Sequence, residues 1–115
     1  MKTYTDLEQS KKLTEILPFE RADMYWKNGV SDKYIQCFTP FVIDEDATNV
    51  NFDYDVPCWS LAALLRELPD TMLGKDKDGY VVMVETMGSG LTTFASNPID
   101  ACYEMIIKLH EQKLL

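Results

Sequence analysis

The chain has 115 residues, of which 46% are hydrophobic, so it is long enough to bury a core without disulfides or a metal. Its formal net charge is −8 at pH 7, and its few lysines and arginines are scattered. Contacts to a nucleic-acid backbone need clustered Lys and Arg, so direct nucleic-acid binding is not expected. From the length we predict one domain over residues 1–115.

The first predicted element is a helix. Residues 5–8 have the form of a capping box, in which the Thr5 hydroxyl and the Glu8 carboxylate satisfy free amides at a helix start. We expect this helix to run to Leu17, because Pro18 cannot continue it.

A β-hairpin is predicted next. Residues 22–27 alternate between apolar and polar, Asn28-Gly29 suits a tight turn, and residues 34–38 supply the returning strand. Residues 39–56 are rich in acidic and turn-forming residues, so we expect a long loop there, with one short strand over 41–43.

A second helix is predicted to begin at Pro57, since proline at the first helical position lacks only an N–H that would have no partner. Its leucines recur with the period of a buried helix face, at Leu61, Leu64, Leu65 and Leu68. Together with apolar residues of later elements they are expected to build the core. The predicted core residues are Trp59, Leu61, Leu64, Leu65, Val82 and Ile106.

A second hairpin and a third helix complete the chain. Residues 80–86 are apolar on both faces and predict a central strand, residues 87–90 turn the chain, and residues 91–94 return. Asn97 then caps a helix with Pro98 in its first turn. The buried stripe of this helix is expected to be Ile99, Cys102, Ile106 and Leu109.

The predicted order is helix, hairpin, helix, hairpin, helix. This is an α+β fold with one antiparallel sheet of about four strands and three helices gathered on one face. The block Pro-Cys-Trp-Ser-Leu-Ala-Ala-Leu-Leu at 57–65, followed by Asn-Pro-Ile-Asp-Ala-Cys at 97–102 and Leu-His-Glu at 109–111, resembles short uncharacterised proteins of gut bacteria and their phages or prophages. The resemblance implies a bacterial or phage cytoplasmic origin and carries no activity with it.

The cysteines and the apolar pattern indicate a compartment. Cys37, Cys58 and Cys102 are widely spaced in apolar contexts, which predicts buried free thiols in a reducing cytoplasm. The first residues lack the apolar core of a signal peptide, and no apolar run is long enough to span a membrane, so no membrane association is expected.

The chain holds little of what catalysis needs. His110 is the only histidine and stands near a predicted helix end, where it is expected to complement the carbonyl groups. Nucleotide-binding and nucleophile-elbow motifs are absent, and Ser89 between two glycines is expected to lie in a hairpin turn. We therefore predict no enzyme activity and no cofactor.

Residues 74–85 partly match an EF-hand calcium loop, with acidic residues at its third, fifth and twelfth positions and glycine at its sixth. The first ligand is missing, because Gly74 stands where the motif has aspartate, and strand-like flanks replace the two helices. A hairpin turn at residues 76–79 is the favoured interpretation, so no metal site is predicted.

Two features are candidates for a partner surface. Tyr25, Tyr34 and Phe38 are expected to share an outward face of the first hairpin, where aromatic residues are typical interface anchors. The acidic stretch of the long loop can imitate a phosphate backbone or dock on a basic partner, although a solvated loop is the favoured interpretation. Its carboxylates are Asp44, Glu45, Asp46, Asp53 and Asp55.

Three classes of function stay open. The leading hypothesis is a small non-enzymatic protein-interaction module, such as a phage or mobile-element accessory protein that binds a host protein or a second copy of itself. The second is an acidic mimic that inhibits a nucleic-acid-binding protein, and the third is an enzyme built on carboxylates such as Asp53, Asp55 and Glu85. An exposed apolar patch favours the first class, a continuous negative face the second, and a cleft with two carboxylates of raised pKa the third.

Overall fold

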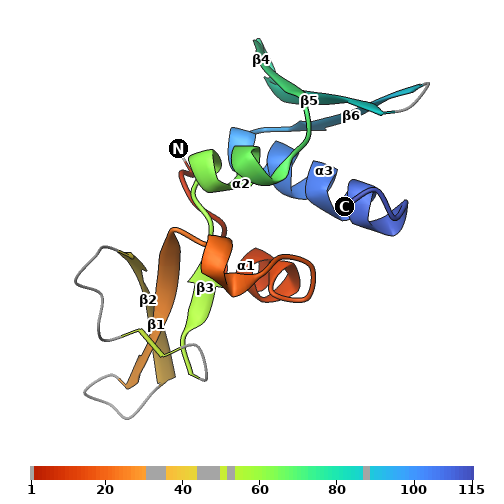
Figure 1. Ribbon diagram of the computed structural model, residues 1–115. Coiled ribbons are helices and arrows are strands. Elements are labelled where there is room, and N and C mark those ends of the chain that lie inside the picture. The colour runs from red at the N-terminus through yellow and green to blue at the C-terminus, as the bar shows by residue number, and fades with distance from the viewer. Residues whose placement is uncertain (1, 31–35, 44–49, 52–53, 87–88) are drawn as a thin grey trace. The chain divides into compact units, whose positions relative to one another are not determined.

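The computed structural model describes residues 2–30, 36–43, 50–51, 54–86 and 89–115. These residues form three α-helices, one 3-10 helix and six strands, so the fold is α+β as expected (Figure 1). The strands build two three-stranded antiparallel sheets, which corrects the prediction of one sheet of about four strands. The chain divides into two compact units, Thr5–Ser60 and Met1–Tyr4 with Leu61–Leu115, and the single domain over residues 1–115 remains a prediction.

The unit Thr5–Ser60 begins with helix α1, Leu7–Leu13. Its N-cap is Asp6: the Asp6 carboxylate accepts the N–H of Gln9 at 2.8 Å, and the Gln9 side chain accepts the N–H of Asp6 at 3.1 Å. The capping box therefore lies one residue later than predicted, because the Thr5 side chain is buried and bonded elsewhere.

Helix α1 also ends earlier than predicted. Its last residue is Leu13, although the N–H of Leu17 still donates to the Leu13 carbonyl at 2.8 Å. Pro18 follows these turns and precedes the 3-10 helix η1, Phe19–Arg21.

The first unit contains a sheet of strand order β2-β1-β3. Its strands are β1, Met24–Val30; β2, Gln36–Val42; and β3, Val56–Cys58. The expected turn at Asn28-Gly29 is wrong, since both residues lie within β1 and the pairing continues to Val30 opposite Gln36. The separate strand expected over 41–43 is the end of β2, which reaches into the segment predicted as a loop. Residues 44–49 and 52–53 of that segment lie outside the described residues.

Pro57 does not start a helix. It lies in β3 opposite Tyr25, and helix α2 begins only at Leu61. Because β3 is an edge strand of its sheet, a proline fits there: its missing N–H can face away from the hydrogen-bonded neighbour.

The second unit combines two helices with a sheet of order β4-β5-β6. Its elements are α2, Leu61–Glu67; β4, Thr71–Asp76; β5, Gly79–Thr86; β6, Ser89–Ala95; and α3, Pro98–Glu111. Strand β5 is central, as predicted, and pairs with β6 as expected. Strand β4 was not predicted, because all but its first residue are exposed and no buried alternation marks it.

Helix α3 lies along one face of β5 and β6 and also contacts α2 (Figure 1). The Asn97 side chain accepts the N–H of Asp100 at 2.9 Å, and Pro98 lies in the first turn, as predicted. The predicted buried stripe is confirmed, because all four of its side chains are fully buried. They are Ile99, Cys102, Ile106 and Leu109.

The predicted core is correct in four of six positions. Trp59, Leu64, Val82 and Ile106 are each fully buried. Leu61 and Leu65 are half-buried, because α2 buries only the face of Ala63 and Leu64. Among the residues that the structure describes, no helix has both the length and the apolarity needed to cross a membrane.

Candidate protein-interaction surface

The β4-β5-β6 sheet turns alternate side chains to opposite faces. On the face that meets α3, Val82 and Val84 are 0% and 1% exposed. Thr93, which pairs with Val82, donates its hydroxyl to the Ala101 carbonyl of α3 at 2.7 Å. Met83, between the two buried valines, therefore points to the other side.

We call this other side the outer face. It consists of side chains that alternate with the buried ones and pair across the strands: Met72, Val81, Met83, Glu85, Thr92 and Phe94. Met72 is 71% exposed, Met83 49% and Phe94 53%. An antiparallel sheet usually covers its solvent side with polar residues, so three exposed apolar side chains on this face are unusual for an isolated chain.

A groove of about 720 Å³ lies at the end of the outer face where β5 finishes. Two methionines and two carboxylates line it, together with residues that alternate with them along the strands, such as Thr71, Val84 and Leu91. The lining residues are Asp70, Thr71, Met72, Met83, Val84, Glu85, Thr86, Gly90 and Leu91. Gly90 pairs with Glu85, and a Cβ added to Gly90 would meet nothing nearer than the Val84 carbonyl oxygen at 4.0 Å.

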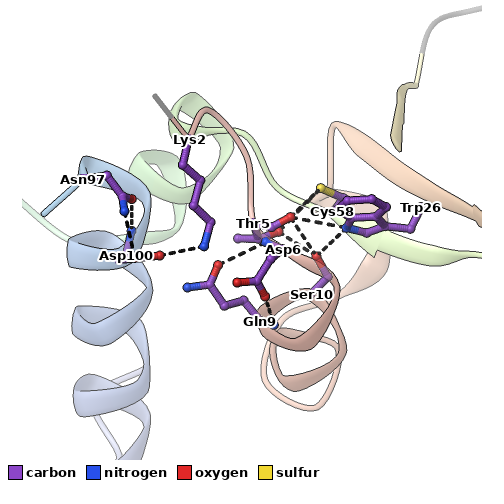
Figure 2. Close-up of polar contacts among 9 residues, drawn as sticks. All are labelled: Lys2, Thr5, Asp6, Gln9, Ser10, Trp26, Cys58, Asn97 and Asp100. Carbon is purple, nitrogen blue, oxygen red and sulfur yellow. Dashed lines mark hydrogen bonds and ion pairs between the residues drawn. The ribbon is translucent and has the colours of Figure 1, made fainter. Parts of the chain in front are cut away.

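The first unit contains a buried polar cluster around Thr5, which Figure 2 shows. The Thr5 and Ser10 hydroxyls share a hydrogen bond of 2.7 Å, and Trp26 Nε1 donates to Ser10 Oγ at 3.1 Å. Cys58 Sγ donates to the Thr5 carbonyl at 3.4 Å, and the Trp59 N–H donates to Thr5 Oγ1 at 3.1 Å. These bonds tie the segment before α1 to strands β1 and β3, which is a structural role.

The described thiols are poor nucleophiles. Cys58 and Cys102 are both free and fully buried, as predicted. Burial raises the pKa of Cys58 and raises the pKa of Cys102 to about 11, so both thiols stay protonated near neutral pH. The side chain of Cys37 lies outside the described part of the chain.

Asp55 is a buried carboxylate rather than part of an acidic surface. Asp55 is only 4% exposed. Its Oδ1 accepts a hydrogen bond from the Asn28 N–H at 2.9 Å. Its Oδ2 accepts hydrogen bonds from the Asn51 N–H at 3.0 Å and from the Lys27 ammonium at 3.4 Å. Burial alone would raise the pKa of Asp55, but the two backbone donors and Lys27 outweigh it, so this pKa lies below its usual value. The prediction of an exposed Asp55 is therefore wrong.

Tyr25 and Phe38, which were predicted to share a face of the first hairpin, lie on opposite faces. Tyr25 is buried and stacks on Phe41 with ring centroids 5.7 Å apart. Phe38 pairs with Asn28, which lies three residues after Tyr25 on β1, so its side chain is on the opposite face of the sheet. There it is half-buried, with Lys11 Nζ 5.6 Å from its ring centroid. Tyr34 lies outside the described residues.

Asp44, Glu45, Asp46 and Asp53 also lie outside the described residues. Glu85 lines the groove of the outer face.

The segment with a partial calcium motif forms a β-hairpin. Strands β4 and β5 pair from Thr71 opposite Val84 to Asp76 opposite Gly79, which agrees with the hairpin-turn interpretation. Over the described ranges, no three His, Cys, Asp or Glu side chains gather as metal ligands. Ser89 is the first residue of β6, and His110 is exposed in the last turn of α3.

The outer face was missed by sequence reasoning. Its signal is present in residues 80–86, whose apolar character on both faces predicts a central strand. Only one side is buried, so the second apolar side was the clue.

No family model matches the chain, and no curated protein or solved structure is significantly similar to it.

Proposed function

We propose that this protein is a non-enzymatic interaction module that binds another protein through the outer face of its β4-β5-β6 sheet. The observation that supports the proposal is the exposure of Met72, Met83 and Phe94 on one face. Methionine and aromatic side chains are enriched at protein interfaces, and methionine adapts its shape to a partner surface. A partner that covers this face removes a large apolar area from water.

The two alternative functions have less support. A carboxylate enzyme would need an available acid or base, whereas Asp55 is already bonded to three donors and its pKa is lowered rather than raised. An acidic mimic would need exposed carboxylates, and Asp55 is buried inside the first unit.

Site-specific photocrosslinking in bacterial cells tests the proposal. A photoreactive phenylalanine analogue replaces Met72 in one variant and Met83 in a second, and both positions lie on the exposed outer face. We expect both variants to crosslink the same protein. The matched control places the analogue at Val42, which is 67% exposed on a strand of the other unit.

The outcome separates three cases. The same heterologous protein at both outer-face positions, with none or much less at Val42, supports the proposal. Equal products at all three positions, or no product at Met72 and Met83, contradict it.

A further inference from the structure

The groove at the end of the outer face joins apolar and acidic chemistry in one hollow. Met72 and Met83 supply exposed thioether side chains, and Asp70 and Glu85 supply carboxylates. Within the described residues, neither carboxylate forms an ion pair with a lysine or arginine of this chain. The groove therefore has unmatched negative charge beside an apolar wall.

Gly90 keeps this groove open. Glycine weakens the interior of a strand, and in such places it often marks a close approach by a ligand or another backbone. The chain's own packing does not require glycine here: an added Cβ has open space, and the backbone is not in the left-handed region. The missing side chain leaves room directly opposite Glu85.

The chemistry of the lining selects a basic side chain. The methylene stem of Lys or Arg packs on apolar surface while its charged end stays polar, so the stem suits the methionines and the cation suits the carboxylates. The net charge of −8 favours a cationic partner and opposes a second copy of the same chain.

On the basis of the proposed function, we propose that the groove receives a Lys or Arg side chain of the partner protein. Its stem lies against Met72 and Met83, and its cation lies between Asp70 and Glu85. The partner's apolar residues then cover the rest of the outer face.

An NMR titration of the whole chain tests the groove without a known partner. The probe is N-acetyl-arginine methylamide, and its control is the citrulline analogue, which has a similar shape and no charge. At low ionic strength the arginine probe should shift amide signals of residues 70–72, 83–86 and 90–91, and the citrulline probe should bind at least about tenfold more weakly.

Two glycine variants make the titration specific. Gly90→Val fills the groove, and we expect it to weaken binding of the arginine probe at least about tenfold. Gly74→Val is the matched control, because Gly74 lies on β4 outside the groove and its added Cβ also meets nothing within 4 Å. It should leave the probe's affinity within about twofold. The double variant Asp70→Asn, Glu85→Gln should abolish the preference for arginine over citrulline.

Three results would overturn the groove proposal. They are equal binding of the two probes, shifts spread over acidic residues outside the groove, or a Gly90→Val variant that binds like the wild type. A partner that crosslinks at Met72 and Met83 yet binds Gly90→Val normally would sink this inference while leaving the proposed function standing. Failure of the crosslinking with a positive titration would contradict the proposed function and leave only the affinity of the groove for a basic side chain.

Discussion

At the scale of single residues, the interior of the first unit is organised by polar groups. Thr5 and Asp55 were expected at a helix cap and on a loop surface, and both are buried with several hydrogen bonds. A buried polar atom that loses its partner costs more than the bond itself contributes, so such residues are sensitive to small changes. Sequence patterns mark polar residues as exposed and give no sign of these long-range partners.

Asp55→Asn should destabilise the protein by about 1–3 kcal/mol near neutral pH. In the wild type each carboxylate oxygen accepts a hydrogen bond from a backbone N–H, whereas in the variant the side-chain NH₂ group must face one of these donors. Urea unfolding followed by tryptophan fluorescence measures the change. Asp78→Asn, in the exposed turn of the β4-β5 hairpin, is the control and should change little.

The cost of Asp55→Asn should also depend on pH. The pKa of Asp55 is lowered in the folded state, so its stabilising effect is fully present above the unfolded value of about 4 and is lost as pH falls through the folded pKa. The difference between wild type and variant should therefore be largest near neutral pH and shrink below about pH 4. A difference that stays constant over this range would contradict the assignment.

The two described thiols should resist alkylation in the native protein. Burial keeps Cys58 and Cys102 protonated and shielded, with the pKa of Cys102 at about 11. Iodoacetamide at mildly alkaline pH should leave both unmodified in buffer and modify both in concentrated urea, as read by peptide mass spectrometry. Rapid native modification of either residue would show that its site opens readily.

At the scale of elements, strands β5 and β6 approach each other closely at Gly79. A Cβ added to Gly79 would lie 2.4 Å from the Ala95 carbonyl oxygen and 2.9 Å from Phe94 Cζ. The Phe94 ring thus lies over the glycine across the β5-β6 pair, which helps fix the register of the two strands.

Gly79→Ala should therefore destabilise the protein by about 1–3 kcal/mol, because the neighbouring carbonyl must move. Gly74→Ala, where the added Cβ meets nothing within 4 Å, should be neutral or stabilise by up to about 1 kcal/mol. Urea unfolding of the two variants gives the comparison, and an equal effect at both positions would refute the contact.

Helices were predicted better than strands because their signals are local. The Asn97-Pro98 start and the apolar stripe of α3 were read correctly from spacing alone. Strands β3 and β4 were missed because β3 is three residues long and contains Pro57, and β4 is mostly exposed. The sequence of residues 80–86 marks the β5 side chains of the outer face, but Met72 joins Met83 only through the pairing of β4 with β5, which the sequence did not predict.

At the scale of the whole molecule, the sheets of the two units differ in what covers their faces. In Thr5–Ser60, Tyr25 of the central strand is buried on one sheet face and Trp26 bonds to the Thr5 cluster on the other. In the unit that contains Leu61–Leu115, α3 covers one sheet face while the outer face exposes methionine and phenylalanine. The central claim is that this second face exists to bind another protein.

The most direct test is the affinity of the crosslinked partner, once purified, for three forms of the full chain. They are the wild type, Met72→Thr with Met83→Thr, and the control Val42→Thr. Both variants replace exposed strand residues by a residue that suits strands. Surface plasmon resonance should show a Kd raised at least about tenfold for the double variant and within about twofold of wild type for the control. Equal affinities for the double variant and the wild type would contradict the claim that the outer face is the binding surface.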